Sequence, residues 1–160
     1  MAKRNYLSGG LRSCGRQVEL ASREAALLER ELAVLVEQLS PQLLSHYGVG
    51  PITAAQLLVS WSHPGRLRSE AAFARLAGAA PIPCSSGKTI RHRLDRGGDR
   101  QLNRALHTIV LARRRGDQRT IAYVQRRISE GKTEREAIRS LKRYNARSLY
   151  RLMEHTNRDT

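Results

Sequence analysis

A heptad pattern of aliphatic residues over residues 18–39 constrains the fold of this chain more than any other feature. The apolar positions are separated alternately by three and four residues, and Glu and Arg fill many of the positions between them. This spacing places the apolar side chains in one narrow seam, whereas a helix packed within its own domain usually shows a wider stripe. We therefore expect residues 17–40 to form a coiled-coil helix that associates with a second copy of the chain, and packing within the same chain is the alternative. The seam consists of Val18, Ala21, Ala25, Leu28, Leu32, Leu35 and Leu39.

Residues 1–16 contain glycines at positions 9, 10 and 15 among scattered basic residues. Glycine lowers helix propensity, and chain ends are often poorly ordered. We expect a flexible lead-in here. The start of the chain also lacks the apolar stretch of a secretory signal.

Positive charge is concentrated in the second part of the chain. The sequence has 29 Lys and Arg against 14 Asp and Glu, a formal net charge of +15, and 23 of the basic residues lie in residues 66–160. Most of these are Arg, whose planar guanidinium binds phosphate in a bidentate manner and stacks on bases. The charge therefore favours a nucleic-acid partner over a merely soluble surface, and one Trp with one Phe argues against a membrane-binding face.

Several other classes of protein are disfavoured by the sequence. No apolar run approaches the roughly 20 residues of a membrane span. Cys14 and Cys84 show neither the spacing of a zinc site nor that of a disulfide scaffold, so we expect no metal site. We expect a reduced, cytoplasmic protein.

The segment around residues 48–50 resembles a helix-hairpin-helix DNA-binding element. Two apolar helical patches flank a Gly48-Val49-Gly50 turn, and Ala54 follows where the second helix would pack closely. Glycine permits the unusual backbone angles of the turn and lets backbone N–H groups approach a phosphate. We expect Gly48 and Gly50 to contact nucleic acid, and an ordinary helical corner without a ligand is the alternative.

The rest of the sequence predicts a mainly α fold. A short helix is expected between Ser69 and Gly78, and residues 79–97 are expected to form irregular chain or short strands. Three helices should follow Gly98, the last of them opened by a capping box of Thr133 and Glu136. Their apolar faces comprise Leu102, Leu106, Ile109 and Val110, then Ile121, Val124 and Ile128, then Ile138, Leu141, Leu149 and Leu152.

The irregular segment carries the residues best suited to chemistry. Ser85, Ser86 and Gly87 are followed within a few residues by a dense group of basic side chains. A serine hydroxyl becomes a nucleophile when a base removes its proton, and attack on a phosphodiester builds negative charge that Arg and Lys stabilise. The segment therefore suits phosphoryl transfer to serine, and a serine–glycine turn beside a phosphate-binding face is the alternative. The basic residues and His are Lys88, Arg91, His92, Arg93 and Arg96.

Five short motifs in a fixed order resemble one protein family. They are Gly48-Val49-Gly50-Pro51-Ile52-Thr53-Ala54, Ala77-Gly78-Ala79-Ala80-Pro81, Ser85-Ser86-Gly87, Arg91-His92-Arg93 and Gly98-Asp99-Arg100-Gln101-Leu102. Over about residues 18–153 the chain looks like the C-terminal domain of the serine-dependent insertion-sequence transposases. Members of that family have an N-terminal RNase-H-like DEDD domain and are known as RNA-bridged recombinases.

The resemblance implies roles for particular residues. Ser86 matches the family's nucleophile, which would form a phosphoserine link to a DNA end, and Ser85 is the second choice. Residues 41–156 would form the DNA-binding, serine-bearing domain, acting on element ends and target DNA, and residues 18–39 would make a homodimer or a higher oligomer. The residues expected to hold phosphates of DNA or of a guide RNA are Lys88, Arg91, Arg93, Arg96, Arg100 and Arg104.

The sequence departs from the family in one respect. The family's catalytic centre also uses acidic residues of the DEDD domain to bind Mg²⁺, and we find no such domain here. Only Asp95 and Asp99 lie near the serine, and Asp99 is better explained as a helix cap. We therefore expect no cofactor in this chain and little activity by the chain alone. A non-catalytic remnant or regulator and an unrelated basic RNA-binding protein are the alternatives.

Overall fold

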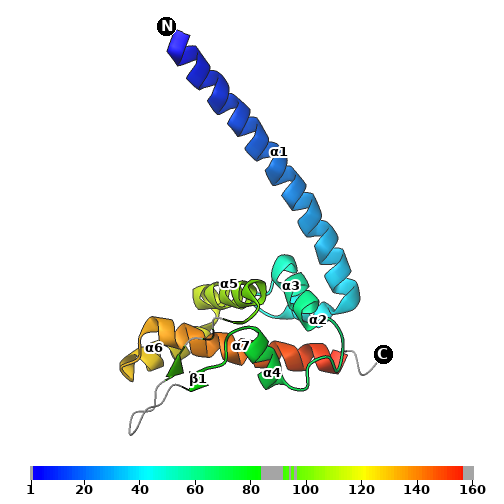
Figure 1. Cartoon of the computed structure of the whole chain (residues 1–160), viewed down its shortest axis with the longest axis vertical. Coiled ribbons are helices and arrows are strands. Elements are labelled where there is room, and N and C mark those ends of the chain that lie inside the picture. Colours follow the sequence, from blue (N-terminus) through cyan, green and yellow to red (C-terminus); the bar gives the residue numbers. More distant parts are fainter. Residues whose placement is uncertain (1, 84–91, 94, 96, 157–160) are drawn as a thin grey trace.

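The computed structural model describes residues 2–83, 92–93, 95 and 97–156, with the side chains of residues 2–9, 83, 92–93 and 156 left undescribed. Within these residues the fold is mainly α, as predicted (Figure 1). The elements are α1 (Ala2–Leu39), α2 (Pro41–Ser45), α3 (Pro51–Trp61), α4 (Glu70–Leu76), β1 (Ile82–Pro83), β2 (His92–Arg93), α5 (Arg100–Gly116), α6 (Gln118–Ser129) and α7 (Glu134–Thr156).

Helix α1 is a long rod that projects away from the other elements (Figure 1). It begins at Ala2, so the prediction of a flexible lead-in over residues 1–16 is wrong for the described part of that segment. Each glycine costs about 1 kcal/mol relative to alanine, but extending an existing helix avoids the larger cost of nucleating a new one. The segment contains no proline that would stop this extension.

The apolar seam of α1 is exposed along most of its length. Leu28, for example, is 53% exposed. The continuous helix also extends the heptad pattern toward the N-terminus, because exposed Leu11 and Cys14 occupy the next positions of the same seam. Near its C-terminal end α1 packs against α3, where Val36 is buried.

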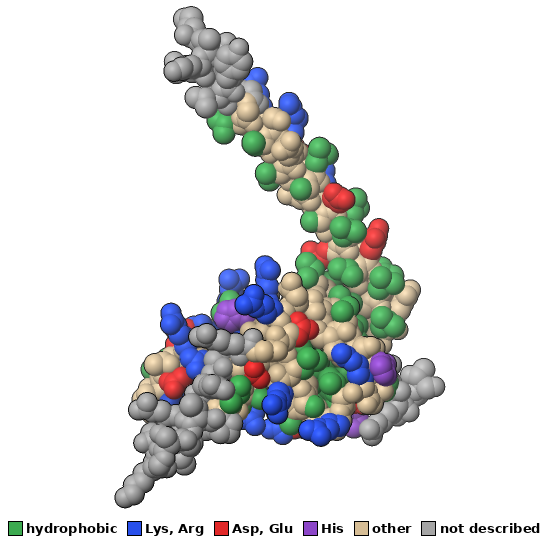
Figure 2. Space-filling model, viewed as in Figure 1, with side chains coloured by type: hydrophobic (Ala, Val, Ile, Leu, Met, Phe, Trp, Pro, Cys, Tyr) green, Lys and Arg blue, Asp and Glu red, His purple; other side chains and the backbone are tan. Residues whose placement is uncertain are grey.

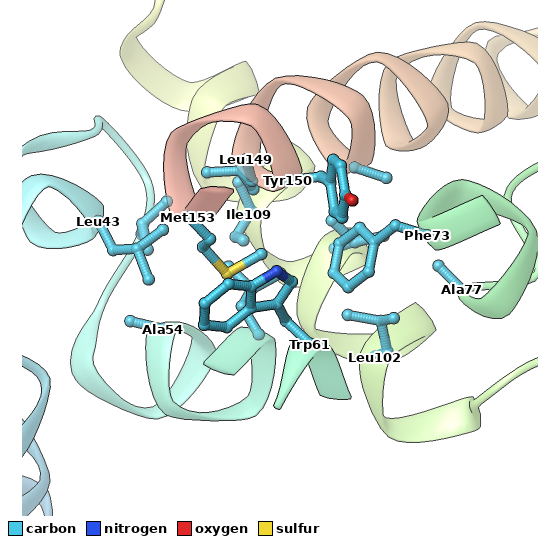
Figure 3. Close-up of a cluster of buried hydrophobic side chains, with 14 of the residues drawn as sticks. Leu43, Ala54, Trp61, Phe73, Ala77, Leu102, Ile109, Leu149, Tyr150 and Met153 are labelled. Atoms are coloured by element: carbon cyan, nitrogen blue, oxygen red, sulfur yellow. The ribbon is translucent and has the colours of Figure 1, made fainter. Parts of the chain in front are cut away.

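Helices α2, α3, α4, α5 and α7, together with Val36 of α1, form one main hydrophobic core (Figure 3). Phe73 of α4 is fully buried, and its ring lies 5.7 Å from that of Tyr150 of α7, centroid to centroid. Leu57 of α3 and Leu106 of α5 are also fully buried in this core. A second, smaller cluster joins α5, α6 and α7 through Val110, Val124, Ala137 and Leu141.

Side-chain caps define where the later helices begin. Thr133 and Glu136 form the predicted capping box, because the Glu136 N–H donates to Thr133 Oγ1 (3.3 Å) and the Thr133 N–H donates to Glu136 Oε2 (2.8 Å). Asp117 accepts from the Thr120 N–H at the start of α6, and Ser69 accepts from the Ala72 N–H at the start of α4. These caps fix the ends of the helices that form the core.

Polar contacts tie α7 to both α3 and α4. Trp61 Nε1 donates to the buried Glu154 carboxylate (2.9 Å). Arg147 and Arg151 both pair with Glu70 at the start of α4. The Phe73–Tyr150 contact and the Glu70 ion pairs hold α4 against α7, whereas the Trp61–Glu154 bond joins α3 to α7.

The core position of Phe73 yields a stability prediction. Phe73→Ala should lower the free energy of unfolding by about 3–5 kcal/mol, because the lost ring leaves a cavity in the core. Val59→Ala, at a side chain that is 74% exposed, should change it by less than about 0.5 kcal/mol. Urea unfolding of both variants measures the difference, and equal effects would contradict this description of the core.

Candidate nucleic-acid interface

Two glycine motifs that lie twenty residues apart in sequence meet where α5 begins. A Cβ atom on Gly98 would lie 2.5 Å from the Gly78 nitrogen and 2.7 Å from the Leu76 carbonyl oxygen. Gly78 has a φ of +61°, which favours glycine, and the Asp99 N–H donates to Leu76 O (2.7 Å). The backbones after α4 and before α5 therefore cross in close contact, and a residue larger than glycine at position 98 would push them apart.

Asp99 caps α5 and links it to α3. Its Oδ1 accepts from the Gln101 N–H (2.8 Å) and the Leu102 N–H (3.0 Å), and its Oδ2 accepts from Ser60 Oγ (2.7 Å). Burial alone would raise the pKa of the Asp99 carboxyl, but the hydrogen bonds from Leu102, Ser60 and Gln101 outweigh it and lower that pKa. This confirms the predicted capping role of Asp99.

The strands β1 and β2, which lie between Gly78 and Gly98 in the sequence, form a short antiparallel pair. Ile82 is paired with Arg93 and Pro83 with His92. The pairing brings together the two ends of the segment that contains the predicted serine. The predicted site residues Ser85, Ser86, Lys88, Arg91 and Arg96 lie outside the described residues, and Arg93 is described only by its backbone in β2.

A cavity of about 450 Å³ opens beside the crossing. It is bounded by the end of α4, the start of α5 and the middle of α7. Lys142 of α7 is 9% exposed and its Nζ donates to Asn103 Oδ1 (2.9 Å), while Asn103 Nδ2 donates to Ala77 O (2.6 Å). The cavity is lined by Ala77, Gly78, Asp95, Gly98, Asp99, Arg100, Asn103 and Lys142.

Sequence reasoning selected Arg100 for this region but missed Asn103 and Lys142. The sequence contained a signal for Lys142, because Lys142, Ala146 and Leu149 are spaced by four and three residues and so lie on one face of a helix. A charged residue on the apolar face of a helix marks a position that the core alone does not explain.

The outer face of α5 is basic. Arg100, Arg104 and Arg115 are exposed at intervals that place them on one side of the helix, together with His107. Figure 2 shows Lys and Arg side chains gathered over α5. Burial, and then the charge of Lys142, lower the pKa of His107, so the arginines supply the positive charge of this face at neutral pH.

Gly48 and Gly50 do not lie with Arg100 and Arg104. Gly48 has a φ of +82°, and a Cβ atom there would lie 3.0 Å from Arg113 Cγ and 3.1 Å from Ile109 O. The turn thus packs against the C-terminal half of α5, about 13–20 Å along the helix from its start. Packing alone accounts for glycine at position 48, and its contact with nucleic acid stays a prediction.

Arg113 holds this turn in place. Its Nε donates to Tyr47 O (2.8 Å), and its Nη1 donates to Asn145 Oδ1 (2.7 Å) on α7. Burial lowers the pKa of Arg113, and the Asp117 charge opposes this shift. Gly50 caps α3, with its N–H donating to Thr53 Oγ1 (3.0 Å).

The described residues contain no group of three or more His, Cys, Asp or Glu side chains that could hold a metal ion. Both oxygens of Asp99 accept hydrogen bonds within the fold, and Asp95 Oδ1 accepts from the Gly97 N–H. Among the described helices, none combines the length and the apolar character needed to cross a membrane.

The crossing yields a prediction that compares two neighbouring glycines. Gly98→Ala should destabilise the domain by about 1–3 kcal/mol or more, because its Cβ meets backbone atoms that must then move. Gly97→Ala should be nearly neutral, since its Cβ would meet only Asp95 Oδ1 at 3.5 Å. Thermal unfolding followed by circular dichroism distinguishes the two, and similar melting temperatures would argue against a tight crossing.

Two comparisons with known proteins point to the same family. The model of the transposase IS116/IS110/IS902 family matches residues 40–125, a range that includes the two glycine motifs and the serine segment. An insertion element IS110 uncharacterized 43.6 kDa protein of Streptomyces coelicolor is 36% identical over 129 residues, which cover 79% of this chain and 32% of the relative. The chain thus spans about a third of the length of that relative. The chain belongs to the IS116/IS110/IS902 family of transposases.

Proposed function

We propose that this chain acts in DNA transposition as the part of a transposase that binds DNA and supplies a nucleophilic serine, Ser86. The observation that carries the proposal is the arrangement at the start of α5. There the two glycine motifs meet, the β1–β2 pair brings together the ends of the serine segment, and the exposed arginines of α5 begin. DNA at element ends and target sites is the proposed partner.

The proposed chemistry is transfer of a DNA phosphoryl group to serine. The Ser86 oxygen attacks phosphorus, a base takes the serine proton, and the bond from phosphorus to the departing DNA oxygen breaks. The exposed arginines of α5, Arg100 and Arg104, are proposed to stabilise the charge on the phosphoryl oxygens. A guide RNA could use the same guanidinium groups as phosphate partners.

Several features limit what the chain does alone. Since the described carboxylates do not form a metal site, the Mg²⁺ implied by the resemblance would need acidic residues of another domain. We therefore propose that strand exchange requires a partner DEDD domain. The bacterial cytoplasm, where the chromosome lies, is the compartment that this function implies.

We also propose that the chain forms a homodimer through the α1 seam. The seam leaves large aliphatic side chains exposed over several turns, while only the C-terminal end of α1 packs against the domain. Burying such a seam against an identical helix removes apolar surface from water and satisfies the heptad spacing.

The serine assignment predicts a covalent intermediate. The chain, mixed with a DEDD domain of a family member, Mg²⁺ and labelled element-end DNA, should form a protein–DNA adduct that survives denaturing electrophoresis. Ser86→Ala should abolish the adduct and Ser85→Ala should retain it. The reverse pattern would move the nucleophile to Ser85, and an adduct that survives both substitutions would exclude serine chemistry in this segment.

Binding controls separate the alternatives to catalysis. A chain that binds DNA but forms no adduct under these conditions would be a non-catalytic remnant or regulator. A clear preference for structured RNA over duplex DNA at matched salt concentration would favour an RNA-binding protein instead.

The dimer proposal predicts different effects at two adjacent leucines. Leu28→Lys, within the seam, should convert the dimer to a monomer because it buries a charge at the helix contact. Leu27→Lys, at a side chain that is 57% exposed but outside the seam, should leave the dimer intact. Sedimentation equilibrium measures both, and a dimer that persists in Leu28→Lys would refute the seam.

A further inference from the structure

Lys142 presents an unusual charge in the interior of the domain. Its side chain is 9% exposed, and its ammonium group carries three N–H donors. The described structure shows Asn103 Oδ1 as a neutral acceptor, and no described carboxylate oxygen lies within 4.0 Å of Lys142 Nζ. Buried charges in proteins are normally paired, so this ammonium group lacks the anion that would compensate for its burial.

The surroundings of Lys142 increase its need for an anion. Burial, followed by repulsion from Arg139, lowers the pKa of Lys142. Arg100 lies at the rim of the same cavity, is exposed, and adds a second guanidinium donor set. The cavity thus combines one buried and one exposed cation.

The two carboxylates that line the cavity are already engaged elsewhere. Asp99 accepts two backbone N–H groups and the Ser60 hydroxyl, and Asp95 Oδ1 accepts from the Gly97 N–H (2.9 Å). The bonds to Asp99 lower the pKa of its carboxyl group. Because both carboxylates are engaged in this way, the remaining N–H donors of Lys142 are left for another anion.

We propose that this cavity binds a phosphate group of a DNA strand, with Lys142 as the buried cation and Arg100 as its partner at the rim. Its volume of about 450 Å³ is ample for a phosphate and lies within the range of about 300–1,000 Å³ that is typical of ligand sites. A phosphate would make charge-assisted hydrogen bonds with both side chains. The source of the phosphate rests on the proposed function, whereas the anion site itself rests on the cavity.

The position of the cavity in the fold suggests which DNA phosphate it takes. Its wall includes Asp95 and the start of α5. In the sequence, β1 and β2 flank the serine segment, and Asp95 of the cavity wall follows β2 by two residues. We therefore assign the phosphate to the DNA strand on which the proposed serine acts, and its binding would fix the register of that strand.

Asn103 positions Lys142 in this arrangement. The amide donates from Nδ2 to Ala77 O, which leaves Oδ1 directed at Lys142 Nζ. Ala77 directly precedes Gly78 of the crossing. Asn103 therefore connects Lys142 to the crossing through two hydrogen bonds.

Phosphate itself provides the first test. At constant ionic strength, replacing chloride by inorganic phosphate should raise the Tm of the full chain by about 2–4 °C, because a ligand that binds the folded state stabilises it. Lys132→Met, at an exposed lysine, should keep this shift, whereas Lys142→Met should lose it. An equal shift in both variants would overturn the site.

A second variant keeps the test decisive if Lys142→Met does not fold. Arg100 is exposed, so Arg100→Gln should fold normally. It should reduce the phosphate shift by at least half. An undiminished shift in Arg100→Gln, combined with an unfolded Lys142→Met, would count against the cavity as an anion site.

DNA binding tests the source of the phosphate. DNA binding is measured by fluorescence anisotropy with a duplex oligonucleotide at several salt concentrations. Lys142→Met should make the negative slope of the logarithm of the association constant against the logarithm of salt concentration shallower by about one, and Lys132→Met should leave this slope unchanged. If the full chain binds DNA and the two variants behave alike, the DNA-phosphate assignment is wrong while the proposed function stands. If the chain does not bind DNA but phosphate stabilises it through Lys142, the proposed function fails and the cavity binds free phosphate only.

Discussion

The close crossing of the backbone at Gly78 and Gly98 is the constraint on which the rest of the domain depends. It joins the end of α4 to the start of α5, so it sets where the α5 arginines begin and where β1 and β2 leave the helices. The Asp99 cap and the Asn103–Lys142 pair are both built on atoms next to this crossing. A change there would therefore disturb fold and site together.

Charge in this domain is arranged in two different ways. Arg113 is half-buried, and its bonds to Tyr47 and Asn145 hold a turn, so it serves the fold. Arg100 and Arg104 are exposed and make no described ion pair, so they remain available to a partner. Lys142 belongs to neither group, because it is buried without a described carboxylate. These cases differ in how far each side chain is buried and in which groups it contacts. The net charge of the chain is the same whichever way its cations are arranged.

Periodicity and cap residues predicted the mainly α fold, the Thr133–Glu136 capping box and the role of Asp99, because these features depend on residues close in sequence. The N-terminal prediction was wrong, since counting glycines ignores how readily a formed helix is extended. The meeting of Gly78 with Gly98 and the burial of Lys142 depend on contacts between distant segments, which local patterns do not specify. The α1 seam stays a prediction, because its test needs a second chain.

The rod-like form of α1 has a geometric consequence for a dimer held by its seam. Its 38 residues correspond to roughly 57 Å, and every residue in a helix advances the axis by about 1.5 Å and turns it by about 100°. The separation and the relative rotation of the two domains would then be set by the number of residues between the seam contact and Ser40. Only insertions near whole heptads would preserve that orientation. The length of α1 would then determine both the distance and the angle between two bound DNA sites.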